Sequence, residues 1–469
     1  MALDRRKFLK MSAAMGAGTA FGAWGLNELS PAIFPEHPVF DTNQSLWMRS
    51  QPPHNPPLAS DLDVDVAVIG GGFTGLSSAY HIALTAPGKS VAVLEAKGVG
   101  NGASGRNGGM LLPNTANEYM QLASAPEVHK QVYQATLESM HELIALANSS
   151  AVEGAIEPIG ALETFETERE AEEGRAYAEK ARGLGIPAEF WDAKKTAAAI
   201  GTAVYNGALF DPNGGHVHPM KLVHVLKLAA ENAGARIYED SPVESIDEGA
   251  VHRIHMTGSQ TVKAKSLVLA TNAYTSKLGY FRNAIVPVYN YVAATPPLSG
   301  EQLAQAGWQS RMPFNDSRTL VYYLGMTRDN RIHIGGGTAA YSFNDGTGER
   351  PDPAAWKNLE EQFVRLFPAL RGVEFDTRWS GVVDMTLDWA PLVGVTGKNH
   401  NIYYGLGYCG HGVNLTFLFG RIIADLQANR AQKWSHLPFV NRKPCYLPNE
   451  PFRWLGVQLE MAYDRLRDR

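Results

Sequence analysis

The feature that most constrains this chain is an apolar segment that runs directly into a cluster of glycines. Residues 64–69 form a nearly continuous apolar run, typical of a strand buried in a parallel sheet. Gly70-Gly71-Gly72-Phe73-Thr74-Gly75 follows, and apolar residues then recur at helical spacing through Leu84. Gly70 permits a tight turn, Gly72 lets the backbone approach a pyrophosphate, and Gly75 allows close packing of helix on strand. This order predicts a dinucleotide-binding α/β fold, with Phe73 and Thr74 at the phosphate-facing start of the helix.

The residues after the next apolar run indicate which dinucleotide is bound. Residues 91–94 predict a second strand that delivers Glu95, about twenty residues past Gly75, where a carboxylate hydrogen-bonds a ribose and repels the 2′-phosphate of NADP. Residues 98–109 are rich in glycine, so their backbone can crowd against a second, elongated part of the cofactor. A nicotinamide dinucleotide needs no such loop, so the sequence predicts FAD. We expect further contacts at Ala96, Ala103, Ser104, Arg106, Asn107, Gly108, Gly109 and Met110, with donors to phosphate or flavin on Ser104, Arg106 and Asn107.

Composition and charge narrow the class of protein. The chain has 469 residues, of which 45% are hydrophobic, enough for two domains. Its net charge of -5 and the lack of a basic block argue against a nucleic-acid partner. Cys409 and Cys445 are too few for a disulfide framework or a multi-cysteine metal site, so we expect no metal and at most one disulfide. A second glycine cluster, at 335–340, precedes no amphipathic helix, which argues against a second nucleotide site.

The first sixty residues predict an export signal followed by a spacer. Arg5 and Arg6 precede a weakly apolar stretch rich in glycine and alanine, which over residues 1–30 resembles a twin-arginine signal. This stretch is shorter than the roughly 20 apolar residues of a stable membrane span. The alternatives are a disordered basic leader and an anchor that stays attached. We expect a periplasmic or otherwise exported enzyme that uses the twin-arginine export machinery, with residues 31–60 as a proline-rich spacer over the surface.

Four sequence blocks resemble those of the D-amino-acid oxidase (DAO) superfamily of FAD-dependent oxidoreductases. They are the glycine turn with Glu95, the loop 102–109, the block 270–274, and a C-terminal pair at 379–394 and 407–413. The resemblance implies an α/β fold whose Rossmann-like, glutathione-reductase-like FAD domain is assembled from residues 61–115, 200–285 and 378–432. Residues 116–199 and 286–377 would form an α+β substrate domain with a mostly antiparallel sheet. Residues 433–469 would form a tail whose final helix is more typical of docking than of a membrane.

The resemblance also implies cofactor contacts beyond the N-terminal blocks. Gly410 and the residues after it would open a helix whose positive end points at the flavin, where reduction accumulates negative charge. His411 then either hydrogen-bonds the flavin or serves only the turn. No histidine lies between Glu95 and Met110, and Cys409 is more typical of a small buried residue than of a thioether link, so we expect noncovalent FAD. The contacts implied here are Val243, Thr271, Gly381, Gly410, His411, Gly412 and Val413.

Enzymes of this family bind an amine in its neutral form over the flavin, and hydride passes from its α-carbon to flavin N5. The protein mainly positions the substrate, so the resemblance implies pocket-lining groups and no nucleophile. Tyr322 and Tyr323 are neighbours in a predicted strand and point to opposite faces, so at most one of them reaches the substrate. The expected catalytic residues are Tyr322, Tyr323, Asp384 and His411, with Tyr289 and Tyr291 as further pocket candidates.

A missing arginine indicates the substrate class. Glycine and D-amino-acid oxidases of this family typically have an arginine just after the glycine where this chain reads Val382-Val383-Asp384, so a clamp for an α-carboxylate is not expected. Asp384 either attracts a cationic amine tail or is held by backbone donors. The pattern favours a small amine substrate of the polyamine type or resembling γ-glutamylputrescine, with O2 or a quinone or carrier as electron acceptor. The alternatives are a D-amino-acid or N-methyl amino-acid dehydrogenase and a non-catalytic FAD-binding periplasmic protein.

Overall fold

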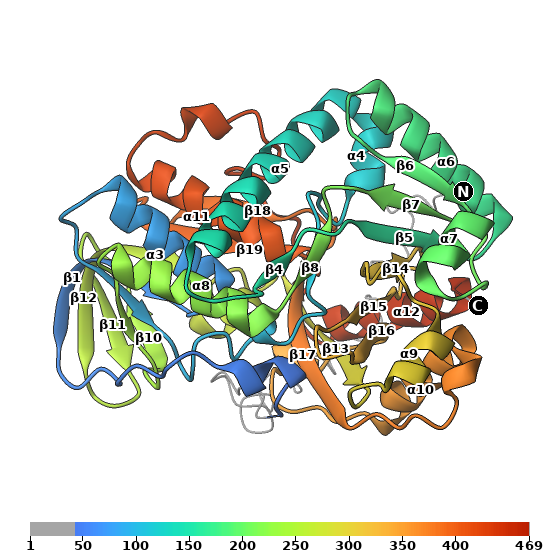
Figure 1. Ribbon diagram of the computed structural model, residues 1–469. Coiled ribbons are helices and arrows are strands. Elements are labelled where there is room, and N and C mark those ends of the chain that lie inside the picture. Colours follow the sequence, from blue (N-terminus) through green and yellow to red (C-terminus); the bar gives the residue numbers. More distant parts are fainter. Residues whose placement is uncertain (1–42, 469) are drawn as a thin grey trace.

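Residues 43–468, which are those that the computed structural model describes, fold around two eight-stranded sheets and one three-stranded sheet (Figure 1). The predicted export signal, residues 1–30, lies outside the described residues. The small sheet consists of β3 (Met110–Leu111), β8 (Gly215–Val217) and β4 (Ile156–Glu157). A mixed α/β fold with a Rossmann-like sheet was predicted, and the two large sheets confirm it.

The first sheet contains the predicted dinucleotide-binding strands. Its members are β1 (Leu62–Ile69), β2 (Val91–Leu94), β9 (Arg236–Tyr238), β10 (Val243–Asp247), β11 (His252–Met256), β12 (Thr261–Leu269), β18 (Leu392–Thr396) and β19 (Ile402–Leu406). β1 lies between β12 and β2 and is parallel to both, and β9 and β19 extend the parallel part. β10, β11 and β18 pair antiparallel at the margins. The carboxyl ends of the central parallel strands therefore meet at one edge, where ligands bind in such sheets.

Burial on both faces explains why β1 is continuously apolar. Val66 and Val68 belong to the core beneath the helices, whereas Ala67 and Ile69 belong to a separate cluster on the opposite face of the sheet. The covering helices are α3 (Phe73–Thr85), α8 (Pro219–Asn232) and α11 (Gly412–Gln427), with α5 (Pro126–Ser149) packed on α11 (Figure 1). Since α3 contacts both α8 and α11, the helix that begins at the glycine turn is held from two sides.

The second sheet is built from strands that are far apart in the sequence. In spatial order they are β17 (Thr377–Met385), β13 (Val286–Ala294), β16 (Ile332–Ala340), β15 (Tyr322–Met326), β14 (Phe314–Asp316), β5 (Ala161–Phe165), β7 (Gly207–Asp211) and β6 (Glu189–Asp192). Only β14 and β5 are parallel neighbours within this sheet of described residues. The predicted mostly antiparallel sheet is thus confirmed.

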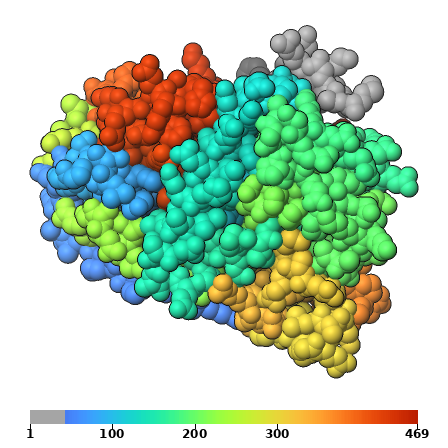
Figure 2. Space-filling model, turned by 45° about the horizontal axis from the view of Figure 1, so that its top comes forward, coloured from blue at the N-terminus to red at the C-terminus, as the bar shows by residue number. Residues whose placement is uncertain are grey.

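Further helices and short 3-10 turns lie around the two large sheets. They are α4 (Glu118–Ser124), α6 (Glu168–Gly183), α7 (Ala193–Ile200), α9 (Gly300–Ala306) and α10 (Pro353–Leu366), with short 3-10 turns η3 (Ala103–Gly105), η4 (Asn272–Leu278), η5 (Phe343–Asp345), η6 (Pro368–Leu370) and η7 (Ala431–Trp434). Figure 2 shows the region of α4 and α5 between the red C-terminal residues and the green residues of α6 and α7. The segment of α4 and α5 therefore connects the two halves of the molecule, because α5 packs on α11 and α4 contacts α6.

The strands depart from the predicted domain ranges at two places. β7 lies within 200–285 and all of β17 but its first residue lies within 378–432, the ranges expected to build the FAD domain, yet both strands belong to the second sheet. β17 pairs along its whole length with β13, which places it as an edge strand of the second sheet. The family blocks mark residues that are expected to meet a cofactor, and such residues lie on both sheets, so the blocks do not delimit a domain.

The segment expected to be a surface spacer is partly buried. Residues 46–50 form the 3-10 turn η2 (Leu46–Ser50), and the Trp47 side chain is only 1% exposed. Trp47 Nε1 donates to Asn107 O at 2.8 Å, and Ser45 Oγ donates to Gly105 O at 2.5 Å. The surface prediction is therefore wrong for this part, because the apolar Leu46-Trp47-Met48 triplet packs into the main core.

The last helix, α12 (Phe452–Arg467), docks on the second sheet. Met461 packs in a small cluster with Val286 and Tyr341, and the buried Arg453 pairs with Asp345 at 3.2 Å. No helix within residues 43–468 combines the length and the apolar character that a membrane crossing requires. Cys409 is buried and Cys445 exposed, and both are free thiols.

Candidate active site

A cavity extends from the glycine turn of the first sheet to the second sheet. Its volume of about 380 Å³ is in the range of small-molecule sites. Of the predicted site residues, those that line it are Gly70, Gly72, Phe73, Thr74, Glu95, Ala96, Ala103, Ser104, Arg106, Asn107, Gly108, Met110, Val243, Thr271, Tyr323, Gly381, Asp384, Gly410, His411, Gly412 and Val413. Gly75, Gly109 and Tyr322 lie outside the lining that the described residues form.

The glycine turn forms one end of the cavity. Gly70 has a φ of +102°, a conformation that favours glycine. A Cβ atom on Gly75 would lie 1.8 Å from Gly70 O, so Gly75 serves the packing of α3 on β1 and does not face the cavity. Phe73 and Thr74 begin α3, whose first-turn amides have no acceptor within the helix. The turn therefore presents the positive end of a helix, an arrangement suited to a pyrophosphate.

Glu95 is fixed beside this turn by the backbone. Its Oε2 accepts from Gly71 N–H at 2.6 Å and its Oε1 accepts from Lys97 N–H at 3.0 Å. Burial raises the pKa of the Glu95 carboxyl, while these two amide donors act in the opposite direction. Each oxygen retains a lone pair that can accept from a ribose hydroxyl. Glu95 thus stands where an adenosine ribose would be held.

The glycine-rich loop uses most of its polar groups within the protein. Ser104 Oγ accepts from Phe73 N–H at 2.9 Å, which joins the loop to the start of α3. The Asn107 side-chain amide donates to Ser104 O at 2.8 Å. Arg106, expected to donate to phosphate or flavin, is 4% exposed, and its guanidinium donates to Asn101 O, Asn43 Oδ1 and Ser380 O at 2.7, 2.7 and 3.1 Å. The expectation for Arg106 is therefore corrected, because this side chain fastens the loop to β17.

Gly109 has a structural role in the same loop. Its φ is +70°, and a Cβ atom there would lie 2.4 Å from Val217 O. Its N–H donates to Asn107 Oδ1 at 2.8 Å, which turns the chain into β3. Gly109 was expected to contact the cofactor. The close approach of β8 instead explains why this position needs a glycine.

A second helix N-terminus forms another part of the cavity. α11 begins at Gly412, and a Cβ atom on Gly410 would meet nothing within 4 Å, so the backbone before the helix is open to the cavity. His411 Nδ1 lies 3.2 Å from Cys409 O, and burial lowers the pKa of the imidazole. His411 serves the turn through this contact while it also lines the cavity. A neutral imidazole and the positive end of α11 can both face a developing anion.

Asp384 holds this turn in place. Its Oδ2 accepts from Gly407 N–H at 2.5 Å and its Oδ1 accepts from Tyr408 N–H at 3.1 Å. The side chain is 1% exposed, and burial raises the pKa of Asp384 to about 7. Two roles were considered for Asp384, and the geometry supports the one in which backbone donors hold its carboxylate. Because both carboxylate oxygens already accept backbone hydrogen bonds, attraction of a cationic amine tail does not fit.

Of the four tyrosines considered, Tyr323 is the one that lines the cavity. Its hydroxyl donates to Asn290 Oδ1 at 2.7 Å, and its ring fits between Gly108 and Gly335, where any Cβ atom would clash with it. Tyr322 points to the other face of β15, where Asn358 Nδ2 donates to its hydroxyl at 2.7 Å, so its predicted catalytic role is corrected. Tyr289 and Tyr291 are fully buried in the core around the second sheet.

Several residues of the cavity wall were missed by sequence reasoning. They lie on the second sheet, on its β14–β15 loop or after β17: Val288, Asn290, Asn315, Thr319, Leu320, Val321, Thr338, Ala339 and Trp389. Thr338 and Ala339 belong to the second glycine cluster, which was set aside as a nucleotide site, and the residues on β13, on β14 and in the β14–β15 loop belong to no glycine or acid motif. The sequence pattern that could indicate the strand residues among them is alternation, in which every second residue faces the cavity. Asn315 and Tyr323, for example, are cross-strand partners on one face of the sheet. Register between strands is needed to find them.

The residues present fit an extended dinucleotide. Helix N-termini at α3 and α11 and the glycines at 70, 72, 108, 381 and 410 leave the backbone close to the cavity along its length. The family model for FAD dependent oxidoreductases, DAO, matches residues 65–426. The chain belongs to this family and is an FAD-dependent oxidoreductase that acts on amines or amino acids.

Two relatives and one solved structure are similar to this chain over most of its length. The chain is 32% identical over 426 residues to the gamma-glutamylputrescine oxidoreductase of Escherichia coli strain K12, covering 88% of this chain and 94% of that protein. It is 31% identical over 395 residues to the probable oxidoreductase OrdL of Haemophilus influenzae, covering 80% and 86%. The crystal structure of glycine oxidase from Geobacillus kaustophilus has the same fold, with a TM-score of 0.70 at 22% identity over 82% of this chain and 100% of that one.

Proposed function

We propose that this protein oxidises the C–N bond of an amine whose reacting carbon carries no carboxylate, of the polyamine or γ-glutamylputrescine type. One observation carries the proposal. Among the described residues that line the cavity, Arg106 has the only lysine or arginine side chain, and its guanidinium is directed at protein acceptors. An α-amino acid would bring a carboxylate on the reacting carbon itself into the buried part of the cavity without a cationic partner, which is costly. The likeness to a gamma-glutamylputrescine oxidoreductase supports the same substrate class.

The cavity favours the neutral form of the amine, which C–N oxidation requires. Burial raises the pKa of Tyr323 and lowers that of His411, so both side chains are uncharged at neutral pH. Asp384 is satisfied by backbone amides and offers no free charge to an ammonium group. Bound FAD supplies the two-electron acceptor. Tyr323, held by Asn290, is the residue we assign to positioning the amine.

An anaerobic screen that follows the absorbance of oxidised flavin tests this proposal. Putrescine and γ-glutamylputrescine should bleach the flavin band, whereas glycine, D-alanine and sarcosine should bleach it at least about tenfold more slowly. Bleaching by the amino acids in preference to the amines would contradict the substrate assignment. A flavin that none of these compounds bleaches would overturn the proposed substrate class.

We further propose noncovalent FAD and export by the twin-arginine pathway. The buried Cys409 thiol, whose pKa burial raises to about 12, is a poor nucleophile for a thioether link and lies 3.3 Å from Thr386 Oγ1. Acid precipitation should therefore release all of the flavin into the supernatant.

The proposal of export rests on Arg5 and Arg6, and replacing both with lysine should move the enzyme from the periplasmic to the cytoplasmic fraction. Oxygen uptake during amine turnover separates an oxidase from a dehydrogenase that uses a quinone or carrier.

A further inference from the structure

The loop between β14 and β15 forms part of the substrate end of the cavity. Residues 317–321 connect these strands, and Thr319, Leu320 and Val321 line the cavity. Both flanking strands also contribute lining residues, Asn315 before the loop and Tyr323 after it. The position of this loop therefore sets the shape of the space where the amine of the proposed function would bind.

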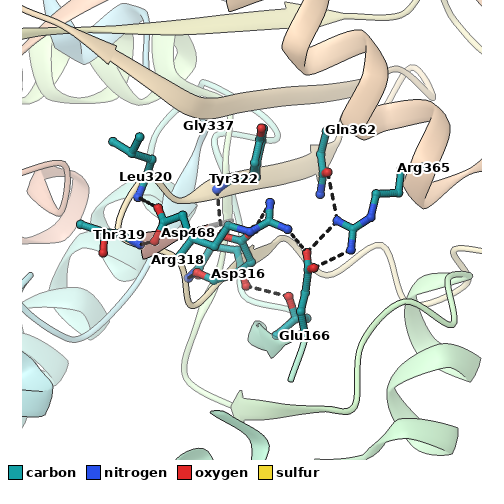
Figure 3. Close-up of polar contacts among 12 residues, drawn as sticks. Glu166, Asp316, Arg318, Thr319, Leu320, Tyr322, Gly337, Gln362, Arg365 and Asp468 are labelled. Carbon is teal, nitrogen blue, oxygen red and sulfur yellow. Dashed lines mark hydrogen bonds and ion pairs between the residues drawn. The ribbon is translucent and has the colours of Figure 1, made fainter. Parts of the chain in front are cut away.

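Several contacts hold the loop to neighbouring elements of the second sheet and its surroundings, among them the bond from Ser317 N–H to Thr164 O at 3.1 Å. Asp316 Oδ1 accepts from Tyr322 N–H at 2.9 Å across its base, and Val321 O accepts from Gly337 N–H at 3.0 Å. The Arg318 guanidinium pairs with Glu166, which also binds Arg365 (Figure 3). These contacts fix the two ends and the outward side chain of the loop, but they leave the backbone amides at its tip to another acceptor.

That acceptor comes from the end of α12, far away in the sequence. Asp468 Oδ1 accepts from Thr319 N–H at 3.1 Å, and Asp468 Oδ2 accepts from Leu320 N–H at 2.7 Å. Figure 3 shows the Asp468 carboxylate beside these two residues at the tip. One carboxylate thus accepts from two successive amides of a loop that lines the cavity. α12 itself is held firmly, because Arg453 is buried and paired with Asp345 and Glu450.

We propose that Asp468 is a positioning residue for substrate binding, acting through the 317–321 loop. The inference rests on the proposed function, because it places the amine at this end of the cavity. Charge-assisted hydrogen bonds to two backbone amides restrain the loop tip in the shape that receives substrate. Without them the tip samples more conformations, and each substrate molecule must reorder it on binding. Asp468 contacts a loop of the second sheet, whereas the glycine turn and Glu95 follow strands of the first, so we expect retention of FAD not to depend on Asp468.

The test compares Asp468→Ala and Asp468→Asn with Glu460→Ala, which removes the same charge from an exposed position of α12. With γ-glutamylputrescine as the probe, Asp468→Ala should raise KM about tenfold with kcat and FAD content within about twofold of the wild type. Asp468→Asn, which keeps an oxygen acceptor for one amide, should give an intermediate KM. Amide hydrogen exchange of the peptide that contains Thr319 and Leu320 should become faster in Asp468→Ala only.

An unchanged KM and unchanged exchange in Asp468→Ala would overturn the inference, as would a fall in FAD content that matches the loss of activity. Equal effects from Glu460→Ala would also overturn it, because they would reflect the charge of α12 and not the two hydrogen bonds. If the wild-type enzyme oxidises none of the amines, the proposed function fails by itself. Exchange at Thr319 and Leu320 then decides whether Asp468 restrains the loop, since it needs no turnover.

Discussion

Replacing Gly75 with alanine should separate the protein from its cofactor. The added Cβ atom would lie 1.8 Å from Gly70 O, a backbone atom that cannot rotate away. Relief requires α3 to move away from β1 by about 1 Å, since non-bonded atoms of this kind approach to no less than about 3 Å. Overpacking of this kind costs about 1–3 kcal/mol of folding free energy. The same movement displaces the first-turn amides of α3, among them that of Thr74, which lines the cavity.

The effect on FAD affinity follows from those amides. Hydrogen bonds to a charged group contribute about 1.5–3 kcal/mol each, so weakening one or two of them should cost about 3 kcal/mol. The dissociation constant of FAD should then rise about 100-fold. Titration of the apoprotein with FAD, followed by quenching of flavin fluorescence, measures this constant. Thermal unfolding of the apoprotein measures the folding cost separately.

Gly183→Ala is the matched control. Gly183 is the last residue of α6, and a Cβ atom there would meet nothing within 4 Å. This variant should bind FAD with the affinity of the wild type. A Gly75→Ala protein that also binds FAD with unchanged affinity would refute the reasoning, because it would show that the tight approach of α3 to β1 does not set the position of the cofactor-facing amides.

Three further predictions concern a carboxylate, a buried ring and pH. Glu95→Gln removes the charge that faces the ribose and should raise the dissociation constant of FAD about tenfold, and an unchanged constant in the same titration would count against the assignment. Trp47→Ala should lower the free energy of unfolding by about 3–5 kcal/mol in urea melts, whereas the exposed Tyr446→Ala should have little effect. Burial and the nearby Glu163 raise the pKa of Glu118 from 4.5 to about 8, so the native state holds a proton that the unfolded chain releases. The free energy of unfolding should therefore fall as pH rises from about 5 to about 8. Glu118→Gln should flatten this pH dependence in melts at several pH values. Equal slopes in the variant and the wild type would show that Glu118 is not responsible.

The dinucleotide end of the site could be predicted because its determinants are local. A buried strand, a turn that needs glycine and an amphipathic helix follow one another between residues 62 and 85, and each leaves its own pattern in the sequence. Glu95 could be placed for the same reason, as the residue after the next parallel strand. These elements need no knowledge of distant pairing.

The substrate end could not be predicted in the same way, because it depends on contacts between distant segments. The chemistry of Arg106 suggested a phosphate donor, but its partners are Asn43 and Ser380, which no local pattern brings near it. Trp47 was assigned to a spacer because the prolines around it outweighed a short apolar triplet. Likewise, the sequence could not show which of Tyr322 and Tyr323 lines the cavity, because that depends on which face of β15 is turned toward it.

The measurement that tests the central claim most directly is the flavin content of the purified protein. If the glycine turn and Glu95 hold the adenosine diphosphate half of FAD, each chain should carry one FAD, and apoprotein should recover it on titration. The released flavin should be FAD and not FMN, since FMN lacks the adenosine that this end of the cavity would bind. Colourless protein that takes up no FAD, or that binds FMN equally well, would contradict the account.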